Sequence, residues 1–231
     1  MHAVMLHGAG GGAWEWNVWR RVFTAAGHRA HCPEFQAVAA GLAATQFEDY
    51  LEQAARAAAE TGASPVLIGA SLGGLLAFAL SMRQECAALI LVNPLPPAPE
   101  AGRLPARVAY PEVIPWGRDA SFASTRAALP DAEPATWHFA WRRWRDESGA
   151  VLNSARAGMV VAEPRCPVRI IASQADEDVP FALSAELALR LGASLQTEPG
   201  SHVGPLLGGR AAGVAQAAVH WLNGLGGFRT D

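Results

Sequence analysis

The sequence feature that most restricts the fold is the segment 69–73, Gly-Ala-Ser-Leu-Gly, between an apolar run and a helix-like run. Residues 65–68 have the length and composition of a short buried strand, and the Leu- and Ala-rich residues 75–80 are typical of a helix. A G-x-S-x-G segment in this context predicts a sharp strand-to-helix turn that exposes the Ser71 hydroxyl as a nucleophile. Glycines are expected at 69 and 73 because side chains there would collide where strand and helix cross. The alternative is a glycine-rich turn without chemistry.

Short apolar segments alternate with helical segments along most of the chain. Strands are expected at residues 2–6, 28–32, 65–68, 87–93, 168–173 and 194–198. Helices are expected at residues 14–26, 47–61, 72–84, 181–191 and 210–222. The alternation predicts an α/β fold in which a mostly parallel sheet of about six strands is covered by helices on both faces.

A proline-rich stretch interrupts this alternation at residue 94, and the pattern returns only at residue 166. Such a break inside one α/β pattern predicts a single domain, residues 1–231, in which residues 94–165 are inserted as a helical cap. The insertion contains half of the eight tryptophans, and Trp137, Trp141 and Trp144 have the spacing of one helix face. Packing inside the cap would explain any one of them. As a group they predict an apolar pocket, with Trp116, Trp137 and Trp141 as the candidate substrate-binding residues.

Composition excludes several classes of function. The net charge of −3 gives no basic footprint for nucleic acid, and no apolar run is long enough to span a membrane. The N-terminal residues lack a signal-peptide pattern, and the three cysteines are odd in number and widely spaced, which predicts a cytoplasmic protein without a disulfide framework. All 18 basic residues are arginine, so lysine-dependent Schiff-base and P-loop chemistry is excluded, and the usage suggests a bacterial source. The expected partner is a small-molecule substrate, and a homodimer is compatible with the sequence.

The first expected strand leads directly into a second glycine-rich loop, residues 7–13. It matches neither a P-loop nor a dinucleotide fingerprint with its following acidic residue. The better interpretation is a loop whose backbone N–H groups face a developing oxyanion, in which His7 orders the loop and is not the base. His28 and His31 have no cysteine or carboxylate at metal-ligand spacing. We therefore expect neither a metal nor a cofactor.

A serine hydroxyl needs an imidazole to take its proton, and the imidazole needs a carboxylate to fix its tautomer. Ser71, Asp176 and His202 follow each other in the chain order Ser, acid, His, each just beyond an expected strand. Asp178 is an alternative acid, and His220, inside the last expected helix, is an alternative base. The expected oxyanion donors are the backbone N–H groups of Ala9 and Leu72.

With these motifs the chain resembles α/β-hydrolase-fold proteins, and within them the branch of plant methylesterases and hydroxynitrile lyases with their bacterial relatives. The pattern H-G-A-x-x-G-x-W-x-W of that branch is matched by His7, Gly8, Ala9, Gly12, Trp14 and Trp16. In that family the acid commonly lies four residues before a proline, so the resemblance selects Asp176, four residues before Pro180. Its histidine follows a short glycine-containing turn, as His202 does here.

The resemblance implies a serine-dependent hydrolase of a small, largely apolar ester, thioester or lactone. Epoxide hydrolases and dehalogenases of this fold use an aspartate where this chain has Ser71. The lyases carry a lysine after the catalytic histidine and a threonine in the oxyanion loop, whereas Val203 and Gly8 stand at those positions. Ala70, where esterases often have histidine, and the lack of glycines after Phe35 are departures that concern the substrate. A C–C bond hydrolase with the same triad and a non-catalytic small-ligand binding protein are the alternatives.

Overall fold

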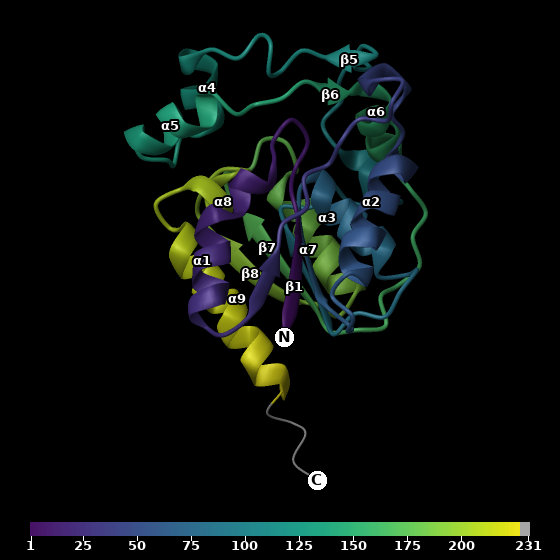
Figure 1. Cartoon of the computed structure of the whole chain (residues 1–231), viewed down its shortest axis with the longest axis vertical. Helices are drawn as coiled ribbons and strands as arrows, with labels where there is room; N and C mark the ends of the chain where they lie inside the picture. The colour runs from purple at the N-terminus through teal and green to yellow at the C-terminus, as the bar shows by residue number, and fades with distance from the viewer. Residues whose placement is uncertain (227–231) are drawn as a thin grey trace.

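The computed structural model of the chain describes residues 1–226, and its centre is one six-stranded sheet in the order β2-β1-β3-β4-β7-β8 (Figure 1). The strands are β1 (His2–Leu6), β2 (Arg29–His31), β3 (Val66–Ala70), β4 (Ala88–Val92), β7 (Val168–Ser173) and β8 (Ser194–Glu198). All neighbouring strands in this sheet pair in parallel. The α/β fold and the six expected strands are therefore confirmed.

Helices cover both faces of the sheet (Figure 1). One face is covered by α1 (Asn17–Ala25), α8 (Gly204–Leu207) and α9 (Ala211–Gly226), and the other by α2 (Phe47–Ala59), α3 (Leu72–Leu80) and α7 (Phe181–Arg190). Because side chains alternate along a strand, Val4 and Leu6 of β1 pack into one core while Ala3 and Met5 pack into the other. This explains why the four inner strands β1, β3, β4 and β7 are mainly apolar, whereas the edge strands β2 and β8 carry several polar residues.

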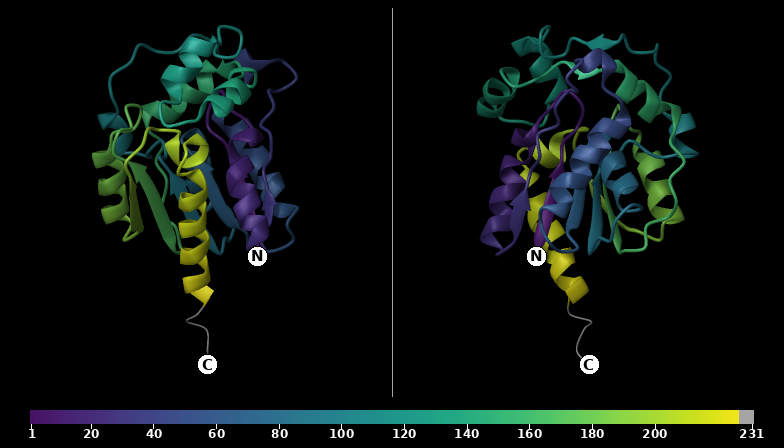
Figure 2. Two further views of the ribbon diagram at one scale, coloured as in Figure 1. Left: turned by 90° about the vertical axis from the view of Figure 1, so that its left-hand side faces the viewer. Right: turned by 45° about the vertical axis from the view of Figure 1, so that its right-hand side comes forward.

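Residues between β4 and β7 lie over the end of the sheet at which its strands finish (Figures 1 and 2). This segment, here called the cap, contains β5 (Val113–Ile114), α4 (Phe122–Ala128), α5 (Pro134–Trp141), β6 (Glu147–Ser148) and α6 (Gly149–Ala157). Short 3-10 helices lie at Ala13–Trp16, Leu42–Ala44 and Glu100–Arg103. The cap thus covers the edge where parallel strands present their loops, which is the usual place for a ligand in such sheets.

The cap differs from the sequence expectation in two details. β5 and β6 form a small antiparallel pair that was not expected, since two residues per strand leave no readable alternation. Helix α5 ends at Trp141, so Trp144 does not share a helix with Trp137. Beyond the end of the helix, the N–H of Arg145 donates to the carbonyl of Gly10 at 2.8 Å and ties this part of the cap to the loop after β1.

In the part of the chain that the structure describes, no helix is both long and apolar enough to cross a membrane.

Candidate active site

Ser71 stands at the strained turn between β3 and α3. Its φ of 52° and ψ of −119° lie outside the regions that a residue with a side chain normally adopts. A Cβ atom at Gly69 would lie 2.0 Å from the carbonyl oxygen of Gly73, and one at Gly73 would lie 2.1 Å from the carbonyl oxygen of Leu6. The steric reason expected for the two glycines is therefore confirmed.

His202 and Asp176 meet across two loops that follow β8 and β7. The Nδ1 atom of His202 lies 2.7 Å from Oδ2 of Asp176. The other carboxylate oxygen of Asp176 accepts the N–H groups of Asp178 and Val179, each at 2.9 Å. The Asp176 side chain is almost completely buried, and these three hydrogen bonds fix its orientation.

The two alternative residues lie elsewhere. Asp178 forms an ion pair with Arg107 at 2.5 Å, and it is Asp176 that accepts the hydrogen bond from the ring of His202. His220 is exposed on α9 and lines a surface hollow that does not include Ser71. The structure thus brings the ring of His202 together with Asp176.

Two further residues hold the loop that carries His202, and sequence reasoning did not single out either of them. Asn93, at the end of β4, is buried with a φ of 41°, and its amide donates to the carbonyl of His202 at 2.7 Å and to Oγ of Ser173 at 2.9 Å. From the cap, a carboxylate oxygen of Asp131 accepts the N–H of Ser201. The sequence could have indicated Asn93, because a polar residue directly after a fully apolar strand is unusual. It could not have indicated Asp131, which reaches the loop only through the tertiary fold.

Opposing effects determine the pKa of His202. Burial alone would lower it, but the hydrogen bond and negative charge of Asp176, with smaller contributions from Asp178 and Glu15, raise the pKa above its ordinary value of 6.5. A base must be neutral to accept a proton, so this histidine becomes competent only as the pH rises through that raised value.

The candidate oxyanion donors are the N–H groups of Ala9, whose neighbour Gly8 packs against Ser71, and of Leu72, which follows Ser71. Leu72 is the first residue of α3, where the helix leaves its N–H groups without internal partners. Within residues 1–226 neither of these two N–H groups donates to a protein acceptor. Ala9 lines the same cavity as Ser71 and His202.

His7 fixes the peptide group that carries the N–H of Ala9. The N–H of Phe35 donates to Nε2 of His7 at 3.2 Å, so the ring proton is on Nδ1, which donates to the carbonyl of Gly8 at 2.8 Å. Burial lowers the pKa of His7 to about 3, and the ring therefore stays neutral. In a trans peptide the C=O and the next N–H point in opposite directions. The bond to Gly8 therefore turns the N–H of Ala9 away from His7.

Several other polar groups of this loop are held from outside it. The carboxylate of Glu15 accepts the N–H of Gly8 at 3.1 Å, and that of Glu147 accepts the N–H of Gly10 at 3.0 Å. Arg145 donates through its backbone to Gly10 and through Nε to the carbonyl of Gly11 at 2.7 Å. Sequence reasoning missed these contacts, because Arg145 and Glu147 lie in the cap, more than 130 positions away in the chain.

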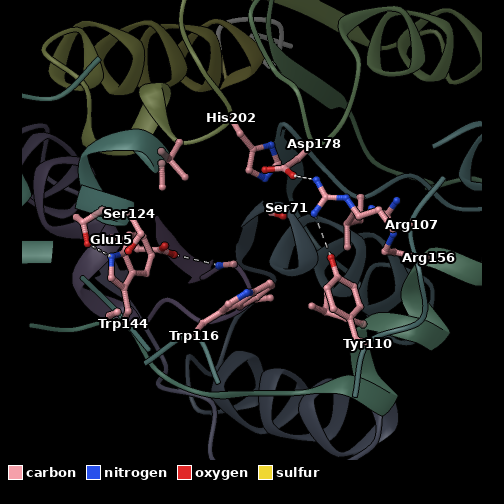
Figure 3. A pocket seen from close by; sticks show the side chains of 18 residues that line it. Glu15, Ser71, Arg107, Tyr110, Trp116, Ser124, Trp144, Arg156, Asp178 and His202 are labelled. Carbon is pink, nitrogen blue, oxygen red and sulfur yellow. Dashed lines mark hydrogen bonds and ion pairs between the residues drawn. The ribbon is translucent and has the colours of Figure 1, made fainter. Parts of the chain in front are cut away.

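A cavity of about 290 Å³ lies between the sheet and the cap. Ser71 and His202 face it near its centre, as Figure 3 shows. Much of the wall is apolar and is formed by Ala9, Leu95, Trp116, Ala120, Ala128, Trp144, Leu152 and Val203. The polar part is formed mainly by Glu15 on one side and by Arg107, Tyr110 and Arg156 on the other (Figure 3). This mixed wall suits a small substrate with one apolar part and at least one polar group.

The three candidate tryptophans are placed differently. Trp116 lines the cavity, while Trp137 and Trp141 are not among its lining residues. Their indole N–H groups donate within the cap, to the carbonyls of Leu129 and Ala120. Trp144, grouped with them by spacing, lines the cavity because the chain has already left α5 at that point.

One cluster has the residue types of a metal site. Asp176, Asp178 and His202 each offer an atom within 4.8 Å of the others. The ring of His202 is bonded to Asp176, and Asp178 is paired with Arg107. These protein partners account for the cluster without an ion.

Comparison with known proteins agrees with this architecture. The model of the "Alpha/beta hydrolase family" matches residues 3–217 of the chain. No curated protein sequence matches the chain. Solved structures with the same fold include a pyrethroid hydrolase from Sphingobium faniae JZ-2, with 18% identity, a TM-score of 0.74 and 99% coverage of both chains.

Two other structures represent the branch that the sequence motifs indicated. Polyneuridine aldehyde esterase has 17% identity and a TM-score of 0.72, with 96% of this chain and 98% of that chain covered. Tomato methylketone synthase I, solved with 2-tridecanone, has 15% identity and a TM-score of 0.75, with 97% and 98% covered. At such identities the likeness establishes the fold. Together with the family match over nearly the whole chain, it shows that this chain belongs to the alpha/beta hydrolase family.

Proposed function

We propose that the protein is a serine-dependent hydrolase, of the carboxylesterase kind, that cleaves a small ester, thioester or lactone through an acyl-enzyme. Family membership and the esterase and hydrolase neighbours support hydrolase chemistry in general. The observation that carries the serine mechanism is that Ser71, His202 and Ala9 line one cavity, while Leu72 follows Ser71 directly as the first residue of α3.

In the first half of the reaction, His202 takes the proton of Ser71 as Oγ attacks the substrate carbonyl carbon. The electron pair of the C=O bond moves to its oxygen, and the resulting oxyanion accepts hydrogen bonds from Ala9 and Leu72. Such preorganised donors are worth about 3–4 kcal/mol each in well-studied cases. Collapse of this intermediate breaks the bond to the leaving group, which receives the proton from His202.

In the second half, His202 takes a proton from a water molecule that attacks the acyl group on Ser71. The same donors stabilise the second oxyanion, and the carboxylic acid leaves as Oγ recovers its proton. Asp176 keeps the Nδ1 proton of His202 in place and stabilises the imidazolium formed in both halves.

The cavity restricts the size and character of the substrate. A volume of about 290 Å³ is at the lower end of ordinary ligand sites, and its aromatic wall favours a compact apolar acyl or alcohol group. Arg107, Tyr110 and Arg156 favour a polar group at the opposite end. The sequence led us to expect a largely apolar substrate, and we now propose that the substrate also carries a polar group at this end.

Hydrolysis of short-chain nitrophenyl esters by the wild type and by Ser71→Ala tests the proposal. We expect turnover that disappears in Ser71→Ala at unchanged thermal stability. Ligand binding without any ester turnover would favour a non-catalytic binding protein instead. Cleavage of a 1,3-diketone at a higher kcat/KM than any ester would favour the C–C bond hydrolase, which uses the same residues.

A further inference from the structure

Glu15 is a buried carboxyl group inside the candidate active site, and the mechanism above does not use it. Its side chain is only 4% exposed, yet it belongs to the cavity wall that also contains Ser71 and His202. It folds back under the oxyanion loop, where a Cβ atom at Gly11 would lie 2.2 Å from its Oε1. Figure 3 shows it reaching toward the centre of the cavity from the side opposite Arg107.

Within residues 1–226, the one hydrogen bond of the Glu15 side chain is made to this loop. Its Oε2 accepts the N–H of Gly8 at 3.1 Å, while His7 holds the carbonyl of the same residue. Glu15 and His7 therefore fix the two peptide groups on either side of the Gly8 Cα atom. The second of these peptides carries the N–H of Ala9, the proposed oxyanion donor.

We propose that Glu15 is a positioning residue of the oxyanion loop. It supports turnover in its protonated, neutral state, and its ionisation lowers kcat/KM. This inference rests on the proposed serine hydrolase mechanism. A neutral carboxyl group holds the N–H of Gly8 without adding charge. An ionised one places a negative charge beside the point where the substrate oxygen becomes negative, in a site where burial weakens screening.

The surroundings of Glu15 favour the neutral form up to neutral pH. Burial is the largest influence and raises its pKa to about 7. The N–H of Gly8, the ring of His202 and the guanidinium of Arg145 lower the pKa, and the neighbouring carboxylate of Glu34 raises it. These charged groups come from the loop before α8, the cap and the segment after β2, and together they do not reverse the effect of burial.

Two protons then control activity in opposite directions. His202 must lose its proton, which favours activity as the pH rises through a value above 6.5. Glu15 must keep its proton, which reduces activity as the pH rises through about 7. The wild type should therefore show a bell-shaped dependence of kcat/KM on pH, with a narrow optimum near neutrality.

The test is the pH profile of Glu15→Gln, whose amide has the same shape and no charge at any pH. We expect the variant to lose the alkaline decline and to exceed the wild type by roughly tenfold or more above pH ~8, as expected for removing one charge near the oxyanion. Its rising limb should also move to lower pH, because ionised Glu15 contributes to the raised pKa of His202.

A matched control is Glu60→Gln, which changes an exposed glutamate at the end of α2 and should reproduce the wild-type profile. A wild-type profile that rises to a plateau above pH ~8 would overturn the inference, as would a Glu15→Gln variant that keeps the decline. If Glu15→Gln fails to fold, the wild-type profile alone still decides. Loss of the proposed function itself would look different, since turnover would then be absent or independent of Ser71 at every pH.

Discussion

The ring of His7 donates a hydrogen bond of 2.8 Å to the carbonyl of Gly8 and thereby orients the next N–H, that of Ala9. A histidine that opens a glycine loop could be mistaken for a catalytic base. Its burial, its low pKa and its acceptance of the N–H of Phe35 instead make it a fixed, neutral part of the loop.

We predict that His7→Ala lowers kcat about 10²-fold, the effect of losing one oriented oxyanion donor, and changes KM much less. His7→Asn, whose amide can still donate to Gly8, should retain more of kcat. Steady-state kinetics at the pH optimum check this, with thermal unfolding as the control for stability. A loss confined to KM would show that the loop binds substrate without stabilising the oxyanion.

Ser71→Ala and His202→Ala should each remove most activity while the protein stays folded. Because the members of a triad act as a unit, the double variant should lose little more than either single variant. Initial rates on one ester for all three variants provide the comparison. Losses that add on a logarithmic scale would argue against a shared mechanism.

Asp176→Asn should reduce kcat by up to about 10⁴-fold, because an amide at this position favours the wrong tautomer of His202. Asp178→Asn should cost far less, since the side chain of Asp178 pairs with the partly exposed Arg107. The two variants are isosteric and only two positions apart, so each controls for the other. The opposite order of losses would transfer the role of the acid to Asp178.

Cyanohydrin cleavage should be negligible. Val203 follows His202 in the cavity wall, so the departing cyanide has no lysine beside the base. Of the two arginines that line the cavity, Arg107 is paired with Asp178 and Arg156 donates to the carbonyl of Pro105. The cap arginines Arg142, Arg143 and Arg145 are not among the lining residues. Cyanide release from mandelonitrile can be measured directly. A Ser71-dependent rate well above the uncatalysed background would contradict this prediction.

The sheet was predictable from the sequence because the signals are local. The inner strands are short apolar runs closed by turns. The Ser71 turn needs Gly69 because a side chain there would collide with the backbone of Gly73, and Gly73 because α3 passes close to the backbone of β1. The order Ser71, Asp176, His202 was likewise readable, because each residue follows a strand end and parallel strands bring these ends to one edge.

The cap side of the site was not predictable in the same way. Whether Trp144 or Trp141 faces the cavity depends on where α5 ends and on how the following residues are held, and Arg145 is held by a hydrogen bond to Gly10, far away in the chain. Arg145 and Glu147 reach the oxyanion loop only through the fold. Glu15 lay within the motif, but its position between tryptophans gives no indication that its carboxyl group turns inward.

Trapping the acyl-enzyme is the decisive measurement for a covalent mechanism at Ser71. A nitrophenyl ester is mixed with the protein, the reaction is quenched in acid during turnover, and intact-mass and peptide spectra are recorded. We predict one acyl group per chain, located on the peptide that contains Ser71 and absent from Ser71→Ala. Acyl label on a different residue, or turnover that survives in Ser71→Ala, would contradict it.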